Sequence, residues 1–420
     1  MIYTTLCGQM ERWRLKLIFT LVIQMEKFFS PADILLAKTD LTKWSVIACD
    51  QYTSEPEYWA ETEKTVGDNP SALKIVLPEV YLSGDNSQRI NEINRNMKEY
   101  LESDVFETLQ NTMILTLRTL KNGAVRKGIV GLIDLEDYSY EKGSDALIRA
   151  TEATVVERIP PRVEIRKDAI LEMPHVMLLI NDPKKTVVEP LTLNVEDYEK
   201  LYDFTLMQNA GSVKGYKIPD ETVAEINRAL ETLKNENDGL LFAVGDGNHS
   251  LATAKECYKN HNGSRYALVE VVNIHDSSLE FEPIYRTVFG ADPNALINAF
   301  VEAMGGEYEG ADAHNYTCVF GDTETKLSLK AKSHLAVADL QIFLDEYIKA
   351  NPQVKVDYIH GVENTKKVAI RENGVGFIFD GMEKSDLFPA VSADGSLPRK
   401  TFSMGCADDK RFYLEARKIK

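Results

Sequence analysis

The stretch that decides the fold is Gly239-Leu240-Leu241-Phe242-Ala243-Val244-Gly245-Asp246-Gly247-Asn248-His249-Ser250. Residues 239–244 are an apolar run of strand length, and residues 251–258 carry apolar side chains at helical spacing. A strand, a glycine-bearing polar turn and a helix start place backbone N–H groups and a positive helix end around one point, where phosphates are typically bound. Asp246 and His249 add a carboxylate and a titratable imidazole. The sequence therefore predicts an anion-binding turn at residues 245–250.

The same turn also has a purely structural interpretation. Asp-Gly is a common turn dipeptide, and Asn248 or Ser250 is of the type that caps a helix. The joint occurrence of Asp, Asn and His between an apolar strand and a helix favours the functional interpretation.

The composition limits the classes of protein to which the chain can belong. The chain has 420 residues, enough for two or three domains, and its hydrophobic fraction of 44% and charged fraction of 27% are those of a soluble protein. The net charge of −17 argues against nucleic acid as a partner, although a small anionic ligand needs only a local basic pocket. The five cysteines are scattered without metal spacing, which is typical of a reduced, cytoplasmic protein.

The N-terminus resembles a signal peptide only faintly. Residues 12–23 are basic and then apolar, but this stretch is shorter than the roughly 20 residues that span a bilayer. Polar residues 24–27 follow in place of a small-residue cleavage site. We expect no membrane association, and we expect residues 1–24 to be an extension outside the fold, with Met25 as the natural start.

Helix and strand patterns alternate along the rest of the chain. Amphipathic helices are predicted over 87–101, 220–233 and 338–348, and strands over 72–77, 113–117, 128–133 and 175–180. Several strands follow one another without an intervening helix, which favours an α+β fold with mixed, largely antiparallel sheets and packed helices. A polar break at 275–278 suggests one domain over 25–275 and a second over 276–420.

Three further segments carry candidate chemistry. Residues 149–166 hold four arginines, whose planar guanidinium groups suit phosphate oxygens, although Glu–Arg pairs on a solvated helix face would look the same. Residues 397–403, Leu-Pro-Arg-Lys-Thr-Phe-Ser, could close over a phosphate or form an exposed loop. Residues 48–56 present polar side chains after an apolar run, at a site for substrate contacts or for the capping of a helix by Thr53 or Ser54.

Several common sites are excluded. Histidines show no zinc-binding spacing, and neither a P-loop nor a Gly-x-Gly-x-x-Gly motif nor a Gly-x-Ser-x-Gly elbow occurs.

Taken together, these segments resemble the family known as domain of unknown function 1015. The shared elements are an Asp-Gly-x-His core at 246–249, a His-Glu-x-Thr element represented by Thr151-Glu152-Ala153-Thr154 and followed by Arg162, and a Pro-x-Lys-Ser/Thr element at 398–401. Residues 69–71 and 78–79 also fit, so the resemblance runs over nearly all of 25–420. The family is similar to free-serine kinases of the ParB/sulfiredoxin superfamily, which implies a ParB/sulfiredoxin-like core.

The chain departs from that pattern at two positions. Thr151 stands where the family element has His, and Ser250 stands where the kinase loop has Arg, so Arg162 or Lys400 would have to supply the missing cation. A sulfiredoxin-type activity looks excluded, because Asn248 occupies the place of the required cysteine.

The resemblance implies a phosphotransferase that moves a phosphoryl group from ATP or ADP, with Mg²⁺, to the hydroxyl of free L-serine or a similar metabolite. Glu152 is the candidate base, Asp246 the metal ligand or alternative base, and His249 a catalytic and phosphate-binding side chain. The other expected phosphate-binding residues are Gly247, Asn248, Ser250, Arg162, Lys400 and Thr401. The expected substrate-binding residues are Asp50, Gln51 and Arg149. The alternative is a non-catalytic, nucleotide- or metabolite-binding regulatory protein, and the sequence leaves the oligomeric state open.

Overall fold

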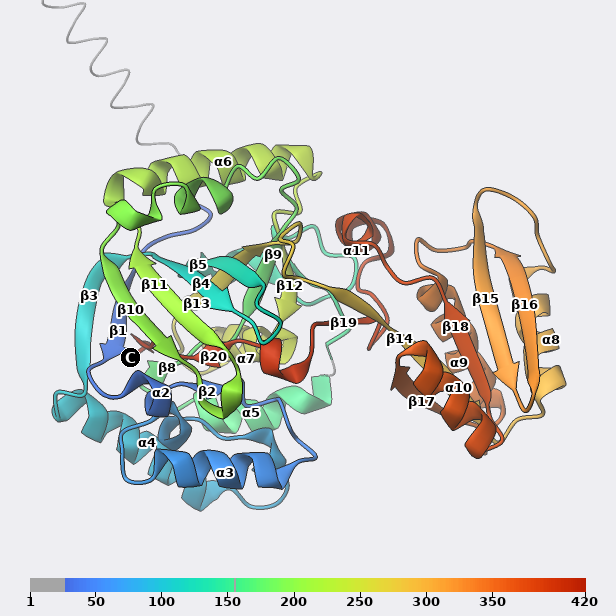
Figure 1. Ribbon diagram of the computed structural model, residues 1–420, viewed down its shortest axis with the longest axis horizontal. Helices are drawn as coiled ribbons and strands as arrows, with labels where there is room; N and C mark the ends of the chain where they lie inside the picture. Colours follow the sequence, from blue (N-terminus) through green and yellow to red (C-terminus); the bar gives the residue numbers. More distant parts are fainter. Residues whose placement is uncertain (1–26, 155) are drawn as a thin grey trace, which may run out of the picture.

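The computed structural model describes residues 27–154 and 156–420. The extension expected over 1–24 and the start expected at Met25 therefore lie outside the described residues. Two sheets of unequal size define two lobes along the long axis of the molecule (Figure 1). We call the part around the nine-stranded sheet the larger lobe and the part around the six-stranded sheet the smaller lobe.

The larger sheet is mixed and mainly antiparallel, as predicted; the strands run parallel only where β13 meets β9, β12 meets β7 and β7 meets β6. Its strands, in spatial order, are β10 (Lys200–Thr205), β11 (Ser212–Lys217), β4 (Ile114–Thr119), β5 (Val125–Asp134), β13 (Tyr266–Asn273), β9 (Met177–Ile180), β12 (Phe242–Asp246), β7 (Ile148–Ala150) and β6 (Tyr138–Ser139).

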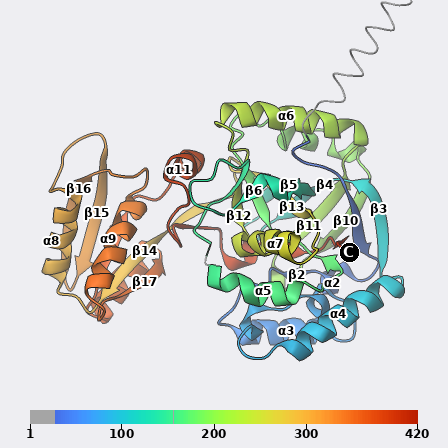
Figure 2. The same ribbon diagram turned by 180° about the vertical axis from the view of Figure 1, so that it is seen from behind.

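Helices cover both faces of this sheet. Alternate residues of the central strands point to opposite faces, so that Ile129 and Val269 join one apolar cluster and Val130 and Leu268 another. The first cluster packs on α6 (Val223–Glu236) and α7 (Asn248–Asn260). The second packs on α2 (Leu41–Trp44), α3 (Pro56–Val66) and α4 (Ser87–Glu102). Seen from behind, α7 lies beside α5 (Ile159–Arg166) (Figure 2).

Three short ladders complete the larger lobe, and two of them use the end of the chain. β1 (Ala32–Ala37) pairs with β3 (Phe106–Thr112), β2 (Val46–Ile47) with β20 (Phe412–Tyr413), and β8 (Leu171–Glu172) with β21 (Arg417–Lys418). The buried Trp44 indole donates to the Leu414 carbonyl at 2.9 Å. The last residues of the sequence therefore pack in the same core as its first strands.

The smaller sheet is joined to the larger lobe by one long strand. The strand β14 (Phe281–Phe289) pairs with β19 (Phe402–Met404) through residues 281–283 and with β17 (Lys355–His360) through residues 284–289. The remaining strands are β18 (Val375–Phe379), β15 (Ala313–Phe320) and β16 (Thr323–Lys330). The helices of this lobe are α8 (Pro293–Met304), α9 (Ala336–Ala350), α10 (Val362–Arg371) and α11 (Leu387–Asp394).

Local patterns predicted most elements, with one clear error. The strands predicted over 113–117 and 128–133 form the hairpin β4–β5, whose turn places Gly123 at φ 84°. The strand predicted over 72–77 is wrong, because Ala72–Ile75 forms a 3-10 helix. The Ser71 hydroxyl caps that helix by accepting the Leu73 N–H at 3.3 Å, and a cap of this kind favours a helical turn over a strand.

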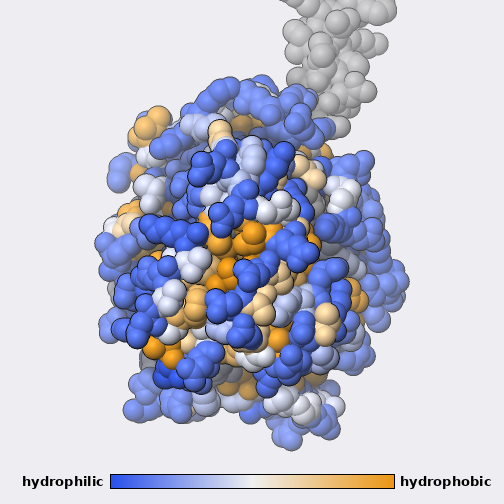
Figure 3. All heavy atoms as spheres, turned by 90° about the vertical axis from the view of Figure 1, so that its right-hand side faces the viewer, coloured by the Kyte–Doolittle hydropathy of each residue, from blue (hydrophilic) through white to orange (hydrophobic). Residues whose placement is uncertain are grey.

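The face of the molecule on the side of the smaller lobe is mainly hydrophilic (Figure 3). Viewed from the smaller lobe, hydrophilic side chains dominate and surround a limited apolar area (Figure 3). In the described part of the chain, we find no helix whose length and apolar character would let it cross a bilayer.

Candidate functional site

The turn between β12 and α7 has the geometry that the sequence predicts. Gly247 is the N-cap residue of α7 and adopts φ 82°, a left-handed conformation that favours glycine. A Cβ at this position would lie 3.1 Å from the Val176 Cα, so a side chain would also be crowded. The capping role considered for Asn248 or Ser250 is wrong, because Gly247 occupies the N-cap position and both residues lie inside α7. The positive end of the α7 dipole lies at this turn, where an anion would be stabilised.

A cavity of about 840 Å³ opens in front of this turn and falls within the size range of small-molecule sites. Its walls come from stretches far apart in the sequence, including residues 49–53, 152–172, 246–253 and 400. The predicted site residues that line it are Asp50, Gln51, Glu152, Arg162, Asp246, Gly247, Asn248, His249, Ser250 and Lys400. Folding thus brings most of the candidates to one place.

Two predicted site residues lie elsewhere. Arg149 does not line the cavity; its Nε donates to the Ala146 carbonyl at 2.9 Å, within its own segment. Thr401 is buried, and its hydroxyl donates to the Pro398 carbonyl at 2.7 Å. The structure thus places these two residues outside the cavity lining, where local backbone carbonyls engage both side chains. Their contacts with substrate and phosphate stay predictions.

Glu152 has a strongly perturbed carboxyl group. Burial raises the pKa of its carboxyl to about 7, although the Lys400 backbone N–H, which donates to it, and the charge of Lys410 act in the opposite direction. The segment around it is fixed by the Leu397 N–H, which donates to the Thr151 carbonyl at 2.6 Å. A carboxyl group that titrates near neutral pH suits a general base.

Thr151, which stands where the family element has histidine, has a structural role here. Its hydroxyl donates to the Val244 carbonyl at 2.6 Å and ties β7 to β12.

Three arginines line the cavity, and two of them are already paired, Arg162 with Glu79 and Arg166 with Glu172. Arg162 Nε donates to Glu79 Oε1 at 2.9 Å, and its Nη1 donates to the Arg158 carbonyl at 2.7 Å. Both partners of this ion pair line the cavity and are largely buried. Glu79 therefore offsets the charge that Arg162 was expected to offer to a phosphate. Arg158 is exposed and also lines the cavity.

His249 is neutral in the absence of a ligand. Burial lowers the pKa of its imidazole to about 4, and the charges of Arg162 and Arg158 act in the same direction. At neutral pH the ring can hydrogen-bond to a phosphate, but it brings no positive charge until an anion binds.

The loop that carries Lys400 is held by a buried arginine. Arg286 of β14 is 0% exposed and donates to the carbonyls of Lys400 at 2.9 Å and Arg399 at 3.0 Å. Its guanidinium carbon lies 4.9 Å from the centre of the Tyr358 ring, and the Lys400 ammonium lies 5.7 Å from the same ring. Lys400 itself adopts φ 55°. The smaller lobe thus positions a cation at a cavity of the larger lobe.

Asp246 is the predicted metal ligand. Its Oδ2 is buried without a hydrogen-bond partner, and Lys410 Nζ lies 3.6 Å from it. Within residues 27–154 and 156–420, no group of three or more His, Cys, Asp or Glu side chains could hold a metal ion. A single carboxylate nevertheless fits Mg²⁺, which commonly takes one or two carboxylates and completes its shell with phosphate oxygens and water.

A connected set of polar residues beside Asp50 was missed in the sequence. The His175 Nδ1 lies 2.9 Å from the Tyr413 hydroxyl, and its Nε2 lies 3.8 Å from Asp50 Oδ2. Burial raises the pKa of Asp50, but His175 and the Gln51 amide outweigh burial, so that its pKa lies below its ordinary value. Asp50 therefore stays ionised at neutral pH.

Sequence signals for the missed residues were weak. The charged run Asp408-Asp409-Lys410-Arg411 before β20 was the only local sign of Lys410. Glu79 fitted the family resemblance without a predicted role, and nothing near Arg286 marks it as part of a site.

Comparisons with known proteins give a family and distant structural neighbours. A structure titled free serine kinase in complex with AMP aligns at 11% identity and TM-score 0.39, covering 69% of this chain and 90% of that one. A conserved hypothetical protein from Pyrococcus furiosus aligns at 13% identity and TM-score 0.36, covering 69% and 94%. The C-terminally truncated SbnI from Staphylococcus aureus aligns at 11% identity and TM-score 0.36, covering 68% and 85%.

No curated protein matches the chain. A family model described as "Protein of unknown function (DUF1015)" matches residues 31–348, which is more than half of the 420 residues. The chain therefore belongs to the DUF1015 family.

Proposed function

We propose that the protein is a small-molecule kinase that transfers a phosphoryl group from ATP or ADP to the hydroxyl of free L-serine or a similar metabolite. The observation that carries this proposal is the meeting of Glu152, the N-terminal end of α7 and Lys400 at one cavity of about 840 Å³. The family resemblance of the sequence supports it, and it implies a ParB/sulfiredoxin-like core and a cytoplasmic protein.

Each part of the cavity has a role in the proposed reaction. The N–H groups at the start of α7 and the neutral His249 ring would bind phosphate oxygens. Lys400 would lie against the charge that grows on the transferred group. Mg²⁺, held by Asp246 and the nucleotide phosphates, would neutralise further phosphate charge.

The acceptor side of the cavity suits an amino acid with a hydroxyl group. Asp50 is ionised and would bind an ammonium group, while the Gln51 amide, 2.9 Å from it, would help to orient the substrate. Glu152 would take the hydroxyl proton as the oxygen attacks the terminal phosphorus. The bond from that phosphorus to the nucleotide then breaks, and the shortened nucleotide leaves.

A second candidate is a regulatory protein that binds nucleotide without turnover. Ser250 stands in place of the arginine of the kinase loop, and Arg162 is already paired with Glu79. These two facts lower the positive charge available for catalysis, but they leave the phosphate-binding turn intact.

A phosphorus NMR assay tests the proposal. The full chain is incubated with Mg²⁺, serine and either ATP or ADP, beside Glu152→Gln, His249→Ala and the exposed control Glu196→Gln. We expect phosphoserine from the wild type and the control, and a loss of about 100-fold or more for Glu152→Gln. Phosphoserine formation that survives both site substitutions would refute the assignment of the site. Nucleotide binding without phosphoserine would favour the regulatory protein.

A further inference from the structure

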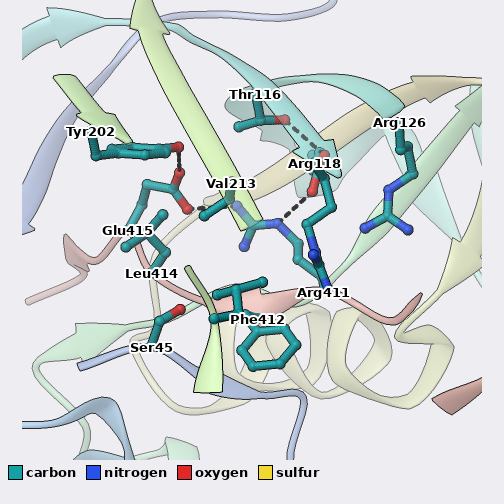
Figure 4. A pocket seen from close by; sticks show the side chains of 12 residues that line it. Ser45, Thr116, Arg118, Arg126, Tyr202, Val213, Arg411, Phe412, Leu414 and Glu415 are labelled. Atoms are coloured by element: carbon teal, nitrogen blue, oxygen red, sulfur yellow. Dashed lines mark hydrogen bonds and ion pairs between the residues drawn. The ribbon is translucent and has the colours of Figure 1, made fainter. Parts of the chain in front are cut away.

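A second, much smaller cavity is lined by Arg411 and by Phe412 of β20 (Figure 4). Its volume is about 30 Å³, close to the share that one water molecule takes in the liquid. Five charged side chains line it, and all are at most 4% exposed: Arg118, Arg126, Arg411, Glu270 and Glu415. Burying so many charges is costly unless each one is compensated.

Both carboxylates are fully engaged. Glu270 accepts from Arg411 Nε at 2.7 Å and from the Thr116 hydroxyl at 2.9 Å. Glu415 accepts from Arg411 Nη2 at 2.7 Å and from the Tyr202 hydroxyl at 2.6 Å. Figure 4 shows Arg411 in contact with Glu415, which in turn contacts Tyr202. These two acids therefore have no oxygen left that requires a further donor.

The positive charges of Arg118 and Arg126 have fewer hydrogen-bond and ion-pair partners. Arg118 donates to the carbonyls of Thr119 at 2.7 Å and Asp408 at 3.2 Å, and Arg126 donates to the carbonyl of Asp409 at 2.6 Å. The Nε of each is buried without a hydrogen-bond partner. Burial lowers the pKa of Arg118 to about 10, and repulsion from Arg126 adds to this effect.

The acids of the neighbouring loop are used elsewhere. The Asp408 carboxylate accepts from Lys121 and from the Tyr52 hydroxyl, and the Asp409 carboxylate accepts from Cys406. In the part of the chain that the structure describes, neither Arg118 nor Arg126 forms an ion pair. Both carboxylates that line the cavity pair with Arg411, so that Arg118 and Arg126 repel each other there without a carboxylate of the described residues in direct contact with either.

We propose that this cavity binds one small monovalent anion of the halide class, such as chloride. One such ion would offset the repulsion between Arg118 and Arg126 and accept from the unpaired Nε group of each. The small volume of the cavity suits a single small ion. Because the same arginines hold the carbonyls of Asp408 and Asp409, the ion would also fix the loop that carries Lys410 to Asp246.

Bromide tests the site directly. Crystals of the full chain soaked in sodium bromide should give an anomalous difference peak inside this cavity, beside Arg118 and Arg126. Data that show only a water molecule there would overturn the proposal, and this readout needs no variant.

Thermal unfolding provides an independent test in solution. Replacing sodium gluconate by sodium chloride at equal concentration keeps the ionic strength constant and should raise the Tm by roughly 2 °C. The rise should be lost in Arg126→Gln and kept in Arg95→Gln, an arginine on the solvent-facing side of α4 with 64% of its side chain exposed. An equal Tm in both salts for the wild type would contradict the proposal.

Discussion

At the scale of single residues, Glu152 shows how burial changes what a side chain can do. Its pKa of about 7 lies well above the ordinary value of 4.5, because the half-buried carboxyl is poorly solvated when ionised. A group raised in this way stabilises the folded state below pH 4.5 and loses that contribution as the pH rises through about 7.

Glu152→Gln should therefore change the pH dependence of stability. The amide cannot ionise, so the variant avoids the cost of a buried charge at high pH. Relative to the wild type, we expect it to gain on the order of 2 kcal/mol in free energy of unfolding between about pH 5 and pH 8. Urea unfolding at the two pH values measures this, with the exposed Glu196→Gln as the control. A difference between wild type and variant that does not change with pH would contradict the raised pKa.

At the scale of elements, the turn between β12 and α7 could be predicted from the sequence because its signals are local. An apolar run, two glycines and a helical pattern lie within a few residues of one another. The hydrogen bonds by which Arg286 holds the 398–401 loop could not be predicted, because Arg286 and the loop lie more than 100 residues apart in the chain. Residue propensities and hydrophobic periodicity indicate only how residues close together in the sequence will fold.

Gly247→Ala tests the turn. An alanine here would adopt an unfavourable φ and also meet Val176, whereas Gly143 has a similar φ of 77° with nothing within 4 Å of an added Cβ. We expect Gly247→Ala to lower the free energy of unfolding by about 1–3 kcal/mol more than Gly143→Ala. Equal shifts in the urea midpoints of the two variants would show that space at Gly247 does not matter.

Arg286→Met tests the support of the Lys400 loop. The substitution leaves the carbonyls of Arg399 and Lys400 without their donor, so the loop should open more often. We expect a loss of about 2–3 kcal/mol in stability and faster hydrogen exchange over residues 397–402. Peptides from β4 and β5, far from this loop, serve as the internal control. Unchanged exchange over 397–402 would mean that Arg286 does not position Lys400.

At the scale of the whole molecule, the net charge of −17 makes nucleic acid a poor partner, although several Arg and Lys side chains line the cavity. We predict that a fluorescently labelled DNA duplex gives no anisotropy change at about 50 mM salt with micromolar protein, because non-specific affinity depends on cations that neutralise several phosphates. A basic DNA-binding protein serves as the positive control. Strongly salt-dependent binding would disprove this prediction.

The larger lobe shows which features could be predicted from sequence patterns and which could not. Its mixed, mainly antiparallel character followed from the order of strands, and most candidate residues do line one cavity. Lys410, His175 and Tyr413 were missed because each matters only through a partner brought close by folding, such as Asp246 or Asp50. Those contacts depend on the return of the chain end to the larger lobe.

That return has a consequence for biosynthesis. Residues 412–413 and 417–418 pair with β2 and β8, and Leu35 exchanges hydrogen bonds with Ala416, near the end of the chain. A ribosome makes these segments after every residue of the smaller lobe has been translated. The larger lobe can therefore complete its core only after the strands of the smaller lobe have been synthesised.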